Sequence, residues 1–269
     1  MESTHISVGR TQYAVIEQGD GPLLLFGHGT FGAKELFEPQ IEQLSHRFRC
    51  VAFDWPGHGG TSYNPDGWTV AELVEDVPEL IDALGAETAY LAGVSQGGAV
   101  FMRVALRHPE RARALINMCG GPGAPPPNVI ETVRAFARTV SEERDEGARR
   151  AAVEDYVNAM FHAPDFAENA PAAATREVDL VLAHPREGVR LAAEIPASYV
   201  SIQPELSKIA CPTLVIWGEY DLRPHLGAEL AAAIPGAKLA TIAGGGHHVN
   251  VDQPAAVSTA IEGFLDSLQ

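Results

Sequence analysis

The chain has 269 residues and a net charge of −16, with 35 acidic residues against 19 lysines and arginines. That length can bury one sizeable core, while the acidity disfavours nucleic acids and anionic membranes, which select basic patches. No apolar run reaches the length of a membrane span and no basic segment leads into an apolar stretch at the start, so we expect a cytoplasmic protein that does not bind membranes.

Apolar runs alternate with helical patterns through the first 119 residues. A hairpin through Gly9 and Arg10 opens the chain, and each later run with strand character is followed by a helix-like segment. The strands are expected at 5–8, 12–18, 23–26, 48–53, 89–92 and 113–119, and the helices at 34–46, 70–84 and from 98 onward. This alternation predicts a mainly parallel sheet with helices on both faces.

The alternation breaks at a Gly/Pro segment, 120–127, and helical periodicity with proline breaks continues to about Pro204. Two further strands, 213–217 and 237–242, precede a closing helix that ends at Leu268. We therefore expect an α/β core formed by residues 1–120 and 205–269, with eight strands. A cap of about four helices, 121–204, is inserted after the sixth strand.

The segment Gly93-Val94-Ser95-Gln96-Gly97 has the pattern G-x-S-x-G between a predicted strand and a predicted helix. A serine at such a turn exposes its hydroxyl near the backbone N–H groups of the helix start. Flanking glycines suit a strained turn that has no room for Cβ atoms. Ser95 is therefore the candidate nucleophile.

A carboxylate and a histidine follow the last two predicted strands. Asp221 lies beyond 213–217, and His247 follows Gly244-Gly245-Gly246. A serine needs a base to take its proton, and an imidazole held by a carboxylate can do so near pH 7. Asp221 is preferred over Glu219 because of its spacing to Pro224, while His248 is expected beside the pocket.

Several segments resemble the α/β-hydrolase superfamily, in the form that has a helical cap over the catalytic face. They are Gly27-His28-Gly29, 54–59 (Asp-Trp-Pro-Gly-His-Gly), 93–98, 218–221 and Gly246-His247 with Asp252 and Pro254. The resemblance spans nearly the whole chain outside the cap. It implies the order Ser95, Asp221, His247 and an oxyanion hole formed by the backbone N–H groups of Thr30 or Phe31 and of Gln96.

The other polar residues of these loops are expected to be structural. His28 and His58 should form hydrogen bonds in glycine loops, Asp54 should hold a turn, and Asp252 should cap the last helix. Cys50, Cys119 and Cys211 each lie in or beside a predicted strand, as a small buried hydrophobic residue would. No residues show metal-ligand spacing. No metal or cofactor is therefore expected.

These residues predict a serine hydrolase that cleaves a small to medium carboxylic ester, lactone or thioester through an acyl-enzyme on Ser95. The expected partner is a small-molecule substrate, and the chain is expected to be a monomer or homodimer. No lone arginine in a strand-end loop stands out as a clamp for an acidic substrate. The residues expected to contact substrate are Phe31, Trp55, Trp68, Phe136, Phe161, His248 and Val249.

Three alternatives stay open on the same residues: a C–C bond hydrolase, a ligand receptor with negligible turnover, and a cofactor-independent oxygenase that uses the His-Asp pair as a base. Haloalkane dehalogenases and epoxide hydrolases of this superfamily carry aspartate at the elbow, so Ser95 disfavours their chemistry.

Overall fold

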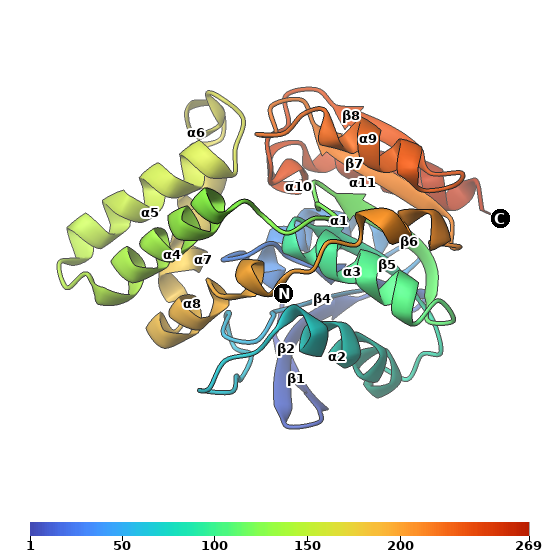
Figure 1. Ribbon diagram of the computed structural model, residues 1–269, viewed down its shortest axis with the longest axis horizontal. Helices are drawn as coiled ribbons and strands as arrows, with labels where there is room; N and C mark the ends of the chain where they lie inside the picture. The colour runs from blue at the N-terminus through green and yellow to red at the C-terminus, as the bar shows by residue number, and fades with distance from the viewer. Residues whose placement is uncertain (269) are drawn as a thin grey trace.

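A single sheet of eight strands forms the centre of the molecule in a computed structural model that describes residues 1–268 (Figure 1). The strands lie in the order β1-β2-β4-β3-β5-β6-β7-β8. Antiparallel pairing joins β1 to β2 and β2 to β4, and all other neighbours are parallel, which confirms the predicted sheet. The strands are β1 (Thr4–Val8), β2 (Thr11–Gln18), β3 (Leu23–Gly27), β4 (Arg49–Phe53), β5 (Ala89–Val94), β6 (Ala112–Met118), β7 (Thr213–Gly218) and β8 (Lys238–Ile242).

Helices cover both faces of this sheet. On one face α1 (Glu38–Leu44) packs against α11 (Pro254–Asp266), and on the other α2 (Val70–Ala83) packs against α3 (Gln96–Arg107), with α9 (Leu226–Ala233) beyond them. Every residue of β3, β5 and β7 is buried, as expected where parallel strands are covered on both sides. Of the helices in residues 1–268, none is long and apolar enough to cross a bilayer.

The insertion between β6 and β7 contains five α-helices, where the sequence suggested about four helices, and two short 3-10 helices, Ile195–Ser198 and Gln203–Lys208. The α-helices are α4 (Pro127–Glu142), α5 (Glu146–Met160), α6 (Phe166–Asn169), α7 (Pro171–Ala183) and α8 (Arg186–Ala192). Figure 1 shows these helices gathered on one side of the core, in green to light orange. Helices α4, α5, α7 and α8 share an apolar cluster of their own, which Phe31 of the core enters from the loop after β3.

Candidate active site

Ser95 lies at the turn between β5 and α3, with φ +51° and ψ −110°. This backbone is strained for a residue with a side chain, and the neighbouring glycines are what make it possible. A Cβ on Gly93 would lie 2.3 Å from the carbonyl carbon of Gly97, and one on Gly97 would lie 2.0 Å from the carbonyl oxygen of Gly27. The turn therefore presses directly against the end of β3 and projects the Ser95 hydroxyl from the sheet.

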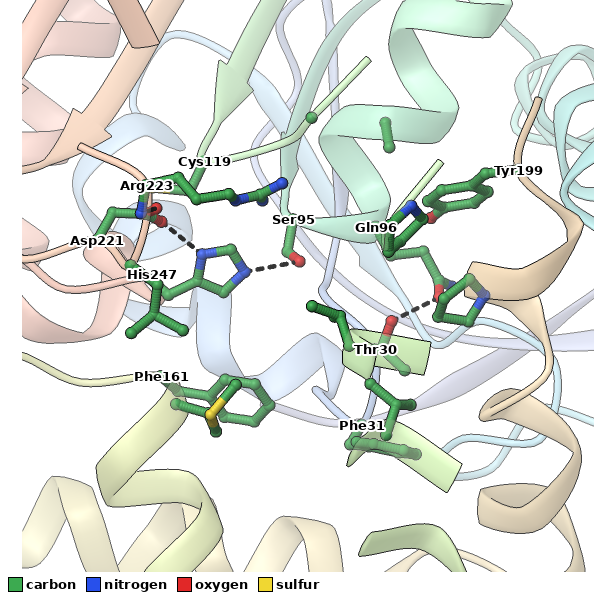
Figure 2. Close-up of a pocket in the computed structure, with 18 of the residues that line it drawn as sticks. Thr30, Phe31, Ser95, Gln96, Cys119, Phe161, Tyr199, Asp221, Arg223 and His247 are labelled. Carbon is green, nitrogen blue, oxygen red and sulfur yellow. Dashed lines mark hydrogen bonds and ion pairs between the residues drawn. The ribbon is translucent and has the colours of Figure 1, made fainter. Parts of the chain in front are cut away.

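His247 joins Ser95 to Asp221 (Figure 2). Its Nε2 lies 2.8 Å from Ser95 Oγ, and its Nδ1 lies 2.6 Å from Asp221 Oδ2. Burial raises the pKa of the Asp221 carboxyl, but the hydrogen bond to His247 and the nearby charge of Arg223 bring that pKa below its ordinary value. An ionised Asp221 accepts the Nδ1–H and leaves Nε2 free to take a proton from the serine.

The alternatives Glu219 and His248 point elsewhere. Glu219 accepts a hydrogen bond from the N–H of Gly244 at 3.0 Å. His248 is buried, and its Nδ1 lies 2.5 Å from Glu177 Oε1 on α7. Neither residue is hydrogen-bonded to the Ser95 hydroxyl, so the hydrogen-bonded series is Ser95, His247 and Asp221.

Two backbone N–H groups beside Ser95 have no acceptor within the described chain, and they belong to Thr30 and Gln96. Gly97 donates its N–H to the carbonyl of His28 at 3.0 Å, which holds the loop after β3 against the start of α3. The N–H of Phe31 is already donated to His58 Nε2 at 3.1 Å. Phe31 is thus not available as an oxyanion donor, which corrects that part of the sequence prediction.

A cavity of about 350 Å³ opens above Ser95, between the core and the insertion. Of the four non-glycine residues with positive φ in the described chain, Phe31, Ser95 and Cys119 line it. Its walls also include Thr30, Gln96, Phe161, Asp221 and His247 from the predicted set. Further wall residues, not predicted from the sequence, are Val129, Val133, Tyr156, Met160, Pro196, Tyr199, Leu222 and Arg223.

Two of the predicted substrate contacts lie in the core rather than in the cavity wall. Trp55 is completely buried beneath the site, and its indole N–H donates to the carbonyl of His28 at 2.8 Å. Val249 is also completely buried, at the start of α10 (Val249–Asp252). Both residues support the loops of the site without lining it.

Three further predicted contacts lie behind the wall. Phe136 stacks on Tyr156, with ring centroids 3.8 Å apart, so Tyr156 faces the cavity in its place. Trp68 packs against Tyr63 in the loop before α2. His248 stacks on Phe161 at 4.0 Å and contributes no surface to the cavity.

Asp252 does not cap the last helix as expected. Its carboxylate accepts the N–H groups of Gly246 at 2.6 Å and Ala163 at 2.8 Å, and it lies 2.6 Å from His162 Nδ1. Gln253 is the residue that precedes α11, and its side chain makes no capping hydrogen bond. The Asp252 carboxylate is therefore bonded to these three partners and not to the start of α11. These bonds join the insertion to the loop that carries His247.

One arginine of the cavity was missed. Arg223 lies two residues beyond Asp221 in the loop after β7, and its side chain lines the mouth of the cavity. Its backbone N–H donates to Asp221 Oδ1 at 2.8 Å. A charged residue does therefore stand in a strand-end loop beside the site, contrary to the sequence analysis.

Within residues 1–268, one group has metal-ligand spacing: Cys119, Asp221 and His247, whose ligand atoms lie within 4.8 Å of one another. Asp221 and His247 are hydrogen-bonded to each other. Burial raises the pKa of the Cys119 thiol well above its ordinary value, so the sulfur is a neutral thiol and a poor ligand. This group fits acid–base chemistry better than metal binding.

A family model described as the alpha/beta hydrolase fold matches residues 22–254. The chain is 29% identical over 254 residues to RutD of Serratia proteamaculans, named as a carbamate hydrolase, with 91% of each chain covered. It is 30% identical to haloalkane dehalogenase 2 of Mycobacterium tuberculosis, covering 95% of this chain and 91% of the relative. The enol-lactonase of Burkholderia xenovorans superposes with a TM-score of 0.86 at 26% identity, covering 98% and 100%.

Proposed function

Since the chain belongs to the alpha/beta hydrolase family, we propose that it cleaves a carboxylic ester, lactone or thioester through an acyl-enzyme on Ser95. The observation that carries this proposal is the hydrogen-bonded series Ser95, His247 and Asp221, placed next to two free backbone N–H groups. Acyl transfer to water uses all of these parts together: a nucleophile, a base, an orienting carboxylate and an oxyanion site.

In the first half-reaction Ser95 Oγ attacks the acyl carbon while His247 Nε2 takes the hydroxyl proton. The carbonyl oxygen becomes an oxyanion that accepts hydrogen bonds from the N–H groups of Thr30 and Gln96. Such donors stabilise charge that develops only in the transition state and are often the largest single contribution to the rate. The protonated His247 then gives its proton to the leaving alcohol or thiol as the acyl-enzyme forms. This group departs from an ester or thioester, and it stays joined to the acyl chain of an opened lactone.

In the second half-reaction water replaces the leaving group. His247 Nε2 takes a proton from the water, whose oxygen attacks the acyl carbon, and the proton returns to Ser95 as the acid is released. Asp221 stays ionised throughout and stabilises the imidazolium. The cavity volume and its apolar walls suit a small to medium substrate.

Of the relatives named above, haloalkane dehalogenase 2 is named for a reaction at a carbon–halogen bond, and the nucleophile distinguishes this chain from that chemistry. Haloalkane dehalogenases of this superfamily use an elbow aspartate, whose carboxylate displaces halide to form an alkyl ester that water then hydrolyses. Ser95 stands at that position here. A serine with a base favours acyl transfer to water over halide displacement.

Labelling with a fluorophosphonate tests this proposal directly. We expect covalent modification of Ser95 and a burst of product on an activated acetate ester, followed by steady turnover. Ser95→Ala should abolish labelling and lower kcat by about 10⁴-fold, leaving the rate due to binding and the oxyanion site. A folded alanine variant that keeps most of the wild-type rate would show that Ser95 is not the nucleophile.

A further inference from the structure

Arg223 differs from most arginines of this chain because its guanidinium has no carboxylate partner among residues 1–268. The chain has many more acidic residues than basic ones, and partners are abundant. Arginines that do form ion pairs are Arg47, Arg49, Arg107, Arg111, Arg134, Arg149, Arg150, Arg176, Arg186 and Arg190.

The position of this unpaired cation is beside the reacting atoms. A Cβ on Gly121 would lie 3.4 Å from Arg223 Nη1, which places the guanidinium against the loop after β6. Its charge acts on the ionisation of both Asp221 and Cys119. Figure 2 shows the guanidinium turned towards Ser95 from the Asp221 and His247 side, with Gln96 and Tyr199 on the opposite side.

The cavity offers this cation one counter-charge, which is already engaged by other hydrogen bonds. Asp221 is its one acidic wall residue, and both of its carboxylate oxygens are engaged, by His247 Nδ1 and by the N–H of Arg223. The remaining walls are largely apolar, including Val129, Met160 and Leu222. An anionic group of the substrate would therefore find a single complementary partner here.

We propose that Arg223 binds a carboxylate carried by the substrate, so that the preferred substrates are half-esters of dicarboxylic acids and carboxylate-bearing lactones. This inference rests on the proposed function, since the ester carbonyl must lie at Ser95 while the carboxylate lies at the cavity mouth. A guanidinium presents parallel N–H donors that match both oxygens of a carboxylate. A neutral group of equal size lacks both the charge and the second acceptor.

Matched ester pairs measure this preference. The monoethyl esters of succinate, glutarate and adipate carry a carboxylate, and the corresponding ethyl ester amides are neutral and of nearly equal size. We expect kcat/KM to favour the acid of at least one pair by about tenfold to a hundredfold, the range for a charge-assisted hydrogen bond. The ratio should fall at high salt because the Arg223 side chain is exposed at the mouth.

Arg223→Gln should bring this acid-to-amide ratio close to one, and Arg223→Lys should keep part of it. The backbone N–H to Asp221 remains in both variants. Arg138→Gln is the matched control, because this variant removes the same positive charge. Arg138 is exposed on the outer side of α4 and lies outside the cavity wall. It should leave the ratio unchanged.

Calorimetric binding of the same esters to Ser95→Ala separates the inference from the proposed function. Tighter binding of the acid, lost in the Ser95→Ala, Arg223→Gln double variant, would support the carboxylate site even if the wild type hydrolysed none of the esters. A wild type that hydrolyses both members of every pair at ratios that Arg223→Gln leaves unchanged would overturn the inference alone. No hydrolysis together with no preferential binding would overturn both.

Discussion

His247 and His248 are adjacent in the chain, but they have different partners and surroundings. His247 lines the cavity between Ser95 and Asp221. His248 is buried between core and insertion, bonded to Glu177 and stacked on Phe161. The backbone N–H of His248 also donates to the carbonyl of Phe161 at 2.7 Å. One residue is thus suited to proton transfer and its neighbour to holding the insertion in place.

Replacing each histidine by glutamine should separate these roles. His247→Gln should lower kcat by several orders of magnitude with little change in the free energy of unfolding, because the base is lost from a partly exposed position. His248→Gln should instead lower the free energy of unfolding by about 1–3 kcal/mol, since it removes one of the two histidines that compensate the buried Glu177 carboxylate. Steady-state kinetics and urea unfolding of both variants measure this, and equal losses of kcat in the two would contradict it.

The candidate catalytic residues follow strand ends and could be predicted from the sequence. The residues that line the cavity around them could not. Ser95, Asp221 and His247 each follow a strand of the sheet, where local pattern and chain order suffice. Arg223 also follows a strand, but whether an exposed arginine turns into a cavity depends on the loops opposite. Phe31 was misassigned as a donor because its partner, His58, comes from another loop.

Helix α5 contributes to the cavity through its last turn, where Tyr156 and Met160 line the wall. The helical period of this segment places Val153, Tyr156, Val157 and Met160 on one apolar face. It could not tell whether that face packs on neighbouring helices or faces substrate, because both require apolar side chains. Tyr156 does both, since it stacks on Phe136 and also lines the cavity.

Enlarging Met160 should therefore change which acyl chains are accepted. Met160→Trp reduces the free volume near Ser95, so kcat/KM for hexanoate and octanoate esters should fall about tenfold or more relative to acetate. Ala159→Trp is the control, because Ala159 is exposed on the outer side of the same helix. A chain-length profile of Met160→Trp that matches both the control and the wild type would show that α5 does not shape the substrate site.

Asp252 on α10 joins the insertion to the loop that carries His247. Burial lowers the pKa of His162, but the carboxylates of Asp252 and Glu177 outweigh it and raise that pKa to about 9. A protonated His162 is thus held between two carboxylates near neutral pH. The sequence could not predict this contact, because it joins positions 90 residues apart in the chain.

Asp252→Asn should lower the free energy of unfolding by about 2–4 kcal/mol, because it removes a charge that compensates a buried imidazolium. The pKa of His162, followed by NMR, should fall in the same variant. Asp66→Asn, in an exposed loop, should change stability by less than about 0.5 kcal/mol. Unchanged stability in Asp252→Asn would mean that this contact does not hold the insertion to the core.

Across the whole molecule, three buried neutral histidines connect loops distant in sequence. His28 Nε2 accepts the N–H of Trp55, and His58 Nε2 accepts the N–H of Phe31. His184, from the insertion, accepts the N–H of Gly59 at Nδ1 and lies 3.0 Å from the carbonyl of Phe31 through Nε2. The sequence predicts structural roles for His28 and His58. It does not predict that His184 links their loops to the insertion.

Each of these histidines accepts a backbone N–H at one ring nitrogen. Protonation of that nitrogen would remove the acceptor and place two N–H groups opposite each other. Burial lowers the pKa of His28 to about 3, and burial also lowers the pKa values of His58 and His184. In the unfolded chain the same imidazoles titrate near pH 6.5. Below that pH the unfolded state binds protons that the folded state refuses, so stability is lost as pH falls.

His162 has the opposite dependence. Its pKa is raised to about 9 in the folded state, so its contribution is fully present below pH 6.5 and is lost as pH rises through 9. The two effects together place the maximum of stability near pH 6.5, between the window of the neutral histidines and that of His162.

We therefore expect the free energy of unfolding to fall on both sides of that pH. Between pH 6.5 and 5 the loss should approach about 1 kcal/mol per pH unit for each of His28 and His58, before most carboxylates begin to titrate. His184→Asn keeps an acceptor for Gly59 without a titrating ring, so its acid slope should be smaller than that of the wild type. Urea unfolding at half-unit intervals from pH 5 to 9 measures both slopes. A stability that stays constant or rises from pH 6.5 to 5 would contradict the neutral assignment, because buried imidazolium ions at these three positions would leave nothing to lose on acidification.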